Sequence, residues 1–257
     1  MIDIHNELSN WAAGSAHSKD FPELTVSTAQ MFPELVMALE KKYGLNQNIG
    51  PIKTSSDFEC ELSQLCGNMF LKYGSDKSRF HDYHHAYAHI IKLIGQNKKI
   101  RLLEVGIGTN TAGFISTMGE AGVPGASLRA WREIFPAADI FGADLDESIL
   151  FSEERIKTFK VDQMDQSTFT NLYENCGSQK FDVIIDDGLH APAANLNTLL
   201  FALGAINNEG WIVIEDILPK HLPMFLIINR VLMNNPSFNT YIVKTKRAYL
   251  YLVRKVM

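Results

Sequence analysis

Two apolar runs in this sequence each end in a pair of carboxylates. The first ends in Asp186 and Asp187, with His190 three residues further on, and the second is followed by Glu215 and Asp216. Buried parallel strands read as short continuous apolar runs, and open α/β sheets bind ligands at the carboxyl ends of their strands. Two neighbouring strands would bring these acids to one edge of a sheet, where they repel one another unless protons or a cation intervene. The pattern therefore predicts a metal-assisted active site.

His190 is the candidate general base of this site. Its spacing from Asp187 would place its ring beside whichever hydroxyl the cation holds, and Pro192 just after it suits the first turn of a helix. The alternative is a histidine that caps this helix or supports a metal ligand.

A glycine-containing turn at the end of an earlier apolar run predicts a nucleotide-type site. Gly106 and Gly108 follow the run, and Glu104 stands before the first glycine. Glycines just past a strand let the backbone turn sharply and approach a ligand closely. A dinucleotide fingerprint needs a third glycine where this chain has Thr111, so the turn disfavours a pyrophosphate and a nicotinamide oxidoreductase.

Polar residues at the ends of the next two predicted strands strengthen this site. Asp144 ends the second strand, where a carboxylate would accept both hydroxyls of a ribose, and Asp162 and Gln163 follow the third, placed to meet an adenine edge. The alternative for Asp144 and Asp162 is a solvated loop acid, and it has more weight for Asp146.

The elements that would position these residues alternate between strand and helix from residue 101 onward. Apolar runs predict strands at 101–105, 139–143, 156–161, 181–185 and 211–214, and helical patterns lie between them at 127–135, 167–175 and 192–205. Such alternation implies right-handed βαβ units and a doubly wound, mostly parallel sheet. A helix around 219–233 precedes strands at 240–244 and 249–253, whose short connection predicts an antiparallel C-terminal hairpin and seven strands in all.

The N-terminal part of the sequence follows a different pattern. Apolar residues recur at helical spacing over 31–39, 58–70 and 83–93, as expected for core or interface contacts. We therefore predict a helical N-terminal extension over residues 1–98, which serves as a lid or in oligomerisation, and a core domain over 99–257. A histidine cluster within the extension shows no carboxylate or cysteine partner, so a lid or surface role is favoured for His81, His84, His85 and His89.

Composition excludes several other classes of protein. A net charge of −5 argues against nucleic acid as a partner. No apolar run approaches the roughly 20 residues that span a bilayer, and residues 1–7 have no signal-peptide pattern. Cys60, Cys66 and Cys176 have no metal-like spacing and predict reduced thiols in a cytoplasmic protein.

Together these motifs resemble the class I S-adenosylmethionine-dependent methyltransferases, a resemblance that rests on the terminal hairpin and on Glu104-x-Gly106-x-Gly108, Asp144 and Asp162-Gln163. More narrowly, the metal-dependent sugar O-methyltransferases of macrolide and polysaccharide biosynthesis have segments similar to residues 125–132, 162–165, 186–190 and 214–216, and to 73–77 with Tyr83, His84 and Tyr87. This chain departs from that group at Leu189, where serine is usual, and in residues 109–124, which form an inserted loop.

The resemblance implies a role for each site residue. S-adenosylmethionine would be held by Glu104, Gly106, Gly108, Asp144, Asp162, Gln163 and Asp186. A divalent cation, Mg²⁺ by the hardness of oxygen ligands, would be bound by Asp187, Glu215 and Asp216. The acceptor would be a hydroxyl of a sugar or glycoconjugate precursor. The alternatives are methylation of another small molecule, at nitrogen or on a catechol-type diol, and a noncatalytic assembly module that binds the cofactor. Whether the chain forms a homo-oligomer stays open.

Overall fold

A computed structural model describes residues 32–33, 36–38, 40–42, 50–114 and 116–256, which fall into two units, Met1–Gln47 and Asn48–Met257. In the first unit the described residues are helical, in agreement with the helix expected there, and the rest of that helix lies outside the described residues. All elements named below belong to the second unit.

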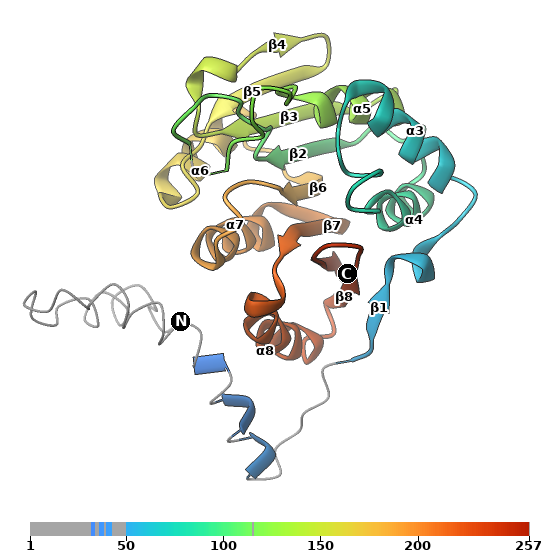
Figure 1. Cartoon of the computed structure of the whole chain (residues 1–257), viewed down its shortest axis with the longest axis vertical. Coiled ribbons are helices and arrows are strands. Elements are labelled where there is room, and N and C mark those ends of the chain that lie inside the picture. The colour runs from blue at the N-terminus through green and yellow to red at the C-terminus, as the bar shows by residue number, and fades with distance from the viewer. Residues whose placement is uncertain (1–31, 34–35, 39, 43–49, 115, 257) are drawn as a thin grey trace, which may run out of the picture. The chain divides into compact units, whose positions relative to one another are not determined.

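The second unit is built on one sheet, in which the described residues form nine strands in the order β1-β8-β9-β7-β6-β2-β3-β5-β4 (Figure 1). The strands are β1 (Ile52–Thr54), β2 (Arg101–Val105), β3 (Asp139–Asp144), β4 (Ser152–Glu153), β5 (Ile156–Lys160), β6 (Phe181–Asp186), β7 (Ile206–Ile217), β8 (Phe238–Lys244) and β9 (Tyr249–Lys255). The five central strands β7, β6, β2, β3 and β5 are parallel, and β9 pairs antiparallel with both β7 and β8.

All seven expected strands are present, but the expected count of seven is two too low. The additional strands are β1, which pairs parallel with β8, and β4, which pairs antiparallel with β5, so each lies at one edge of the sheet. They are three and two residues long, too short to leave an apolar run in the sequence.

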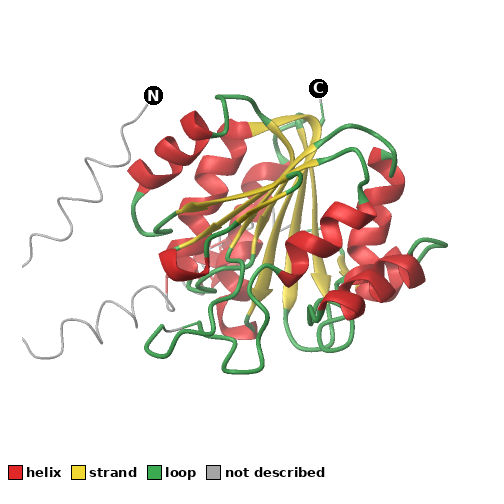
Figure 2. Ribbon diagram, turned by 90° about the horizontal axis from the view of Figure 1, so that it is seen from above, coloured by secondary structure: helices red, strands yellow, loops and turns green. Residues whose placement is uncertain are grey.

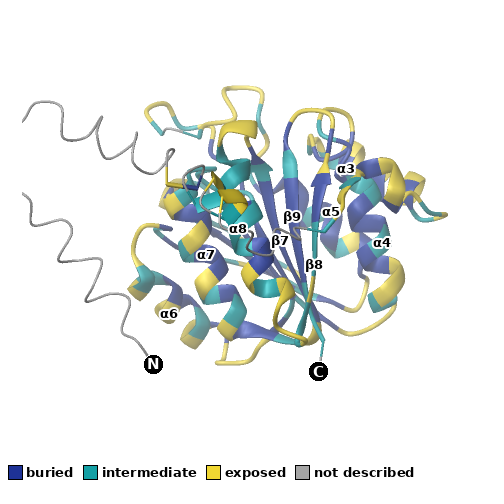
Figure 3. Ribbon diagram, turned by 90° about the horizontal axis from the view of Figure 1, so that it is seen from below, coloured by how far each residue is buried: buried dark blue, intermediate teal, exposed yellow. Residues whose placement is uncertain are grey.

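Helices cover both faces of the sheet (Figure 2). Buried side chains of α3 (Ser63–Tyr73), α4 (His84–Ile94) and α5 (Ala126–Ile134) join one core cluster, and those of α6 (Gln166–Asn175), α7 (Pro192–Ala205) and α8 (Leu222–Met233) join the other. Successive strand residues point to opposite faces, so Leu102 belongs to the first cluster and Leu103 to the second. The strands are accordingly buried while the outer helix faces are exposed (Figure 3). No helix in the described part of the chain is long and apolar enough to cross a membrane.

Helices α3 and α4 belong with the sheet and not with a separate extension. The rings of Phe70 on α3 and Tyr87 on α4 pack edge-on against Trp131 of α5, with centroids 4.9 and 4.8 Å apart. These helices bury the face of the sheet that would otherwise lie open. The chain therefore divides after Gln47, and not after residue 98 as the helical pattern had indicated. A lid or oligomerisation role for the N-terminal residues stays a prediction.

Candidate active site

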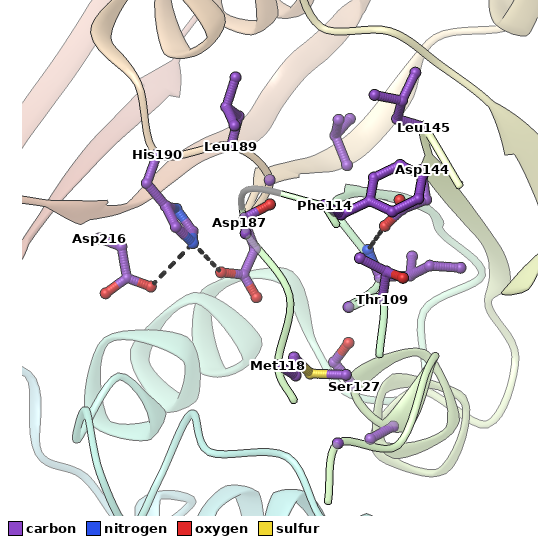
Figure 4. Close-up of a pocket in the computed structure, with 18 of the residues that line it drawn as sticks. Thr109, Phe114, Met118, Ser127, Asp144, Leu145, Asp187, Leu189, His190 and Asp216 are labelled. Atoms are coloured by element: carbon purple, nitrogen blue, oxygen red, sulfur yellow. Dashed lines mark hydrogen bonds and ion pairs between the residues drawn. The ribbon is translucent and has the colours of Figure 1, made fainter. Parts of the chain in front are cut away.

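A cavity of about 840 Å³ lies at the carboxyl ends of the parallel strands. Its wall combines residues that follow β2, β3, β5, β6 and β7 with parts of the 109–124 loop and of the segment before α4. The lining includes Gly74, Asp76, Phe80, Gly106, Gly108, Asp162 and Gln163. It also includes Phe114, Met118, Asp144, Asp187, His190 and Asp216, which are labelled in Figure 4. One space thus joins the predicted nucleotide site to the predicted metal site.

The turn after β2 needs its two glycines. Gly106 and Gly108 have φ angles of +87° and +82°, in the left-handed region that favours glycine. A Cβ on Gly106 would also collide with the carbonyl oxygen of Asp187, and one on Gly108 with the side chain of Met118. The backbone can therefore pass close to the end of β6 only because residue 106 has no side chain.

Asp144 and Asp162 both face the cavity, and backbone amides orient them. Asp144 accepts hydrogen bonds from the amides of Ile107 (2.9 Å) and Asp146 (3.0 Å), one on each carboxylate oxygen (Figure 4). Asp162 accepts one from the amide of Met164 at 2.8 Å. Each carboxylate oxygen keeps a further lone pair that can accept a ligand hydroxyl.

Asp146 is not a solvated loop acid. It is only 4% exposed and accepts hydrogen bonds from the Thr109 hydroxyl (2.5 Å) and from the amide and hydroxyl of Ser148. The hydrogen bonds from Ser148 and Thr109 hold the pKa of this carboxyl well below its usual range. Asp146 thus fixes the start of the 109–124 loop.

Gln163 borders the cavity, but its side-chain amide forms hydrogen bonds with β6, with α7 and with the loop between them. Its Nε2 donates to Asp186 (2.8 Å) and to Thr198 (2.9 Å), and its Oε1 accepts from the amide of Leu189 (2.7 Å). Asp186 is fully buried, and its other oxygen accepts from Asn195 at 3.0 Å. Asp186 therefore lies behind the cavity wall, where it supports the loop.

Asp187, His190 and Asp216 form an open charge cluster in the cavity, with ligand atoms that all lie within 4.8 Å of one another. His190 Nε2 lies 4.0 Å from Asp187 Oδ1 and 3.8 Å from Asp216 Oδ2, and the three side chains face one another (Figure 4). The other Asp216 oxygen accepts from the Tyr83 hydroxyl at 2.7 Å and lies 3.4 Å from His81 Nδ1. The histidine cluster thus has a carboxylate partner that the sequence did not show.

The backbone is unusual at two members of the open charge cluster. His190 and Asp216 have φ angles of +55° and +52°, which non-glycine residues rarely adopt. At Asp216 the cause is a bulge, because Ile214 and Ile217 of β7 pair with Tyr251 and Tyr249 of β9, so that two residues of β7 lie opposite one residue of β9. Such outliers gather at functional sites.

Lys77 is the centre of a second, buried charge cluster. Its side chain is 1% exposed, and its Nζ lies 2.5 Å from Asp187 Oδ2, 2.7 Å from Glu215 Oε2 and 3.3 Å from Glu104 Oε1. Burial alone would lower the pKa of Lys77, but the three carboxylates outweigh it and raise this pKa above its usual value. Lys77 therefore stays protonated and supplies the positive charge that these three carboxylates need.

The remaining oxygens of the buried cluster also have partners. Glu215 Oε1 accepts a hydrogen bond from the Tyr87 hydroxyl, and Glu104 Oε2 accepts one from the Trp131 indole at 2.7 Å. Burial and the charge of Asp187 raise the pKa of Glu215 well above its usual value. Glu104 and Glu215 are buried, and neither lines the cavity.

The structure thus brings some of the predicted residues together and sets others apart. Gly106, Gly108, Asp144, Asp162, Gln163, Asp187, His190 and Asp216 line one cavity, whereas Glu104, Asp186 and Glu215 lie behind its wall. Lys77, Tyr83 and Tyr87 were not predicted as site residues. The signal that points to Lys77 is the number of acids at the strand ends, since buried carboxylates need a counter-charge.

No protein-family profile matches the chain. It is 31% identical over 158 residues to the 8-demethyl-8-(2-methoxy-alpha-L-rhamnosyl)-tetracenomycin-C 3'-O-methyltransferase of Streptomyces olivaceus, covering 61% of this chain and 38% of the relative. It is 32% identical over 130 residues to the mycinamicin VI 2''-O-methyltransferase of Micromonospora griseorubida, covering 51% of this chain and 30% of the relative. The chain spans less than half the length of these curated relatives.

Solved structures show the same fold. The MycE methyltransferase from the mycinamycin biosynthetic pathway, in complex with Mg and SAH, matches with a TM-score of 0.60 and 23% identity over 77% of this chain and 55% of that one. The chain has the methyltransferase fold. A second MycE structure, with Mg, SAH and mycinamycin VI, matches with a TM-score of 0.61 and 22% identity over 77% of this chain and 54% of that one. The predicted doubly wound sheet with a C-terminal hairpin is confirmed, as is the resemblance to sugar O-methyltransferases.

Proposed function

We propose that this chain is an S-adenosylmethionine-dependent O-methyltransferase that needs a divalent cation and acts on a hydroxyl of a sugar or glycoconjugate precursor. The observation that carries the proposal is the single cavity in which the glycine turn and Asp144 meet Asp187, His190 and Asp216. The names of the curated relatives and of the MycE complexes support it.

The residues at one end of the cavity fit the methyl donor. The turn at Gly106 and Gly108 leaves room beside the backbone, and the Asp144 carboxylate, oriented by two amides, can accept the hydroxyls of a ribose. Asp162 borders the same space. Glu104, Gln163 and Asp186 would act here by holding the wall in place.

The residues at the other end fit a divalent cation. Asp187 and Asp216 offer carboxylate oxygens within one coordination sphere of each other, as Mg²⁺ prefers. Glu215 would join them only if it shared an oxygen with Lys77 or Tyr87, because both of its oxygens are engaged. S-adenosylmethionine would supply the methyl group, and the cation would lower the pKa of the acceptor hydroxyl.

The chain's own residues then orient the acceptor and remove its proton. Lys77 holds Asp187 by Oδ2 and the Tyr83 hydroxyl holds Asp216 by Oδ1, so the oxygens left over face His190. His190 presents Nε2 to the same space and accepts the proton of the acceptor hydroxyl there. Because one cavity holds the glycine turn and the open charge cluster, a methyl donor and an acceptor would meet within one enclosed space.

Binding and turnover test this proposal together. Calorimetry should show binding of S-adenosylhomocysteine and none of NAD. A chelator should abolish methyl transfer to a hexose-containing acceptor, and Mg²⁺ should restore it. Asp187→Asn and Asp216→Asn should lose Mn²⁺ binding and activity yet stay folded, whereas Glu174→Gln, at an exposed acid on α6, should change neither. Tight binding of NAD alone, or full activity in excess chelator, would contradict the proposal.

A further inference from the structure

One aromatic side chain of the cavity wall has two cationic side chains beside it. Phe80 lines the cavity and is 46% exposed, although large aromatic side chains are usually buried. The guanidinium carbons of Arg247 and Arg79 lie 5.3 and 5.9 Å from the centroid of its ring. We call these three residues the aromatic–cationic rim.

The fold places this rim next to the open charge cluster. Phe80 precedes His81, whose Nδ1 lies 3.4 Å from Asp216. Arg247 lies in the turn between β8 and β9, and the pairing of Ile217 with Tyr249 carries this turn past the end of β7, where Asp216 lies. A ligand whose hydroxyl meets His190 would therefore extend towards the rim.

The rim is held by buried hydrogen bonds. Asp82 is 7% exposed and accepts from the Lys246 amide at 3.0 Å and from the Ser55 hydroxyl at 2.6 Å. The turn is closed by Thr245, whose hydroxyl donates to the carbonyl of Ala248 at 2.8 Å. The turn that carries Arg247 is thus fixed to the segment that carries Phe80.

The two rim guanidinium groups have no acidic partner. Among the described residues, neither Arg79 nor Arg247 forms an ion pair or a hydrogen bond with a carboxylate, and both are exposed. Arg129 and Arg132, in contrast, both pair with Glu153. The nearby acids are already engaged, Asp82 as described and Asp76 by His81 at 3.4 Å. These two guanidinium groups lie beside the ring of Phe80, which lines the cavity, and can therefore bind an anion from outside.

We propose that the rim is an acceptor subsite for a saccharide that carries an anionic oxygen group, a phosphate or a carboxylate. Arg79 and Arg247 would bind that group, since guanidinium matches phosphate and carboxylate geometry, and Phe80 would pack against the apolar face of the sugar ring. The positive rim also offsets the repulsion that Asp187 and Asp216 exert on an anionic acceptor. This inference rests on the proposed function and narrows its substrate class.

The first test uses inorganic phosphate as the probe. It is titrated into the metal-free protein with S-adenosylhomocysteine bound, and into the double variant Arg79→Met/Arg247→Met. We expect the double variant to bind phosphate about tenfold or more weakly, because charge-assisted hydrogen bonds are lost. Lys180→Met, which removes an exposed charge at the amino end of β6, is the matched control and should bind like the wild type. Equal results for the wild type and the double variant, including no binding by either, would overturn the inference.

The second test separates the sources of the anion. A hexose 1-phosphate, a nucleoside diphosphate hexose, a hexuronic acid and a neutral methyl hexoside are compared as acceptors with Mg²⁺ and methyl donor. The anionic acceptors should have the lower KM, and the double variant should raise that KM with a smaller effect on kcat. Preference for the neutral hexoside would overturn the inference. Failure to bind S-adenosylhomocysteine or Mn²⁺, measured in parallel, would instead refute the proposed function.

Discussion

Glu215 and Asp216 are neighbours on β7, yet they belong to different charge clusters. Glu215 is 1% exposed, and its two oxygens are engaged by Lys77 and Tyr87. Asp216 reaches the cavity, where it lies across from His190 and keeps an oxygen without a hydrogen-bond donor among the described residues. The bulge in β7 lies at these two residues, and the backbone at Asp216 is in the left-handed region.

The difference shows how the same residue type serves structure in one place and chemistry in another. In the buried cluster Lys77, Tyr87 and Trp131 lie against the carboxylate oxygens, so little capacity is left for a ligand. In the open cluster the carboxylates face a histidine across an accessible space. Asp187 belongs to both, with Oδ2 on Lys77 and Oδ1 towards His190. The buried cluster therefore sets the position of a carboxylate that the open cluster uses.

Removal of Lys77 should have the largest effect, and it should act on stability. Lys77→Met leaves Glu104, Glu215 and Asp187 without their cation, and breaking a buried ion pair in this way costs about 3–5 kcal/mol of unfolding free energy. Urea denaturation measures the loss. Lys72→Met, which removes the exposed partner of Glu133, is the control and should change stability little. If both variants unfolded at the same urea concentration, Lys77 would not be holding the buried acids.

Removal of His190 should act on turnover alone. His190→Ala should lower kcat by about 10²- to 10⁴-fold, the usual contribution of a general base. Binding of S-adenosylhomocysteine and the urea midpoint should stay unchanged, because His190 faces the carboxylates at the acceptor end. Steady-state kinetics on the acceptor with the lowest KM gives the answer. Near-normal kcat would reduce His190 to a structural residue of the loop before α7.

The sheet and its helices were predictable because their signals are local. The pattern over 192–205 matches α7 residue for residue, since Pro192 starts the helix and the apolar residues continue to its end. The same logic fails for β1 and β4, whose few residues take their conformation from pairing with β8 and β5. Local pattern also separated residues 50–94 from the sheet, although their apolar stripes are buried against α5.

The candidate site was predictable in its residue types and less so in their partners. Strand ends marked Asp144, Asp187 and Asp216, because parallel strands expose their carboxyl ends at one edge. The partner of Asp187 and Glu215 is Lys77, which lies 110 and 138 positions away in the sequence. Only the packing of the segment before α4 against the carboxyl ends of β6 and β7 brings it there. An acid that faces a ligand and an acid that faces a lysine look alike in sequence.

Removal of Asp144 tests the end of the cavity that would bind the methyl donor. It shows whether this end acts separately from the open charge cluster at the other end. Asp144→Ala should weaken binding of S-adenosylhomocysteine by roughly 1–3 kcal/mol, the cost of leaving buried hydroxyls without an acceptor. Mn²⁺ binding should not change, since Asp144 lies outside the open charge cluster. Calorimetry on both ligands checks this. Loss of both would mean that the two ends of the cavity do not act independently.

The pH dependence of cation binding should give the smallest and most specific effect. Burial raises the pKa of Asp187 to about 6, against the opposing influence of Lys77. Because a cation needs the ionised carboxylate, the affinity for Mn²⁺ should be full above this pKa and fall by about tenfold for each pH unit below it. The sign follows from the raised pKa, since an ordinary aspartate would stay ionised to a much lower pH. Electron paramagnetic resonance of Mn²⁺ at a series of pH values measures this fall. Asp187→Asn should bind the ion weakly at every pH, and a wild-type affinity that stays constant from pH 7 to about 5 would show that Asp187 is not a ligand.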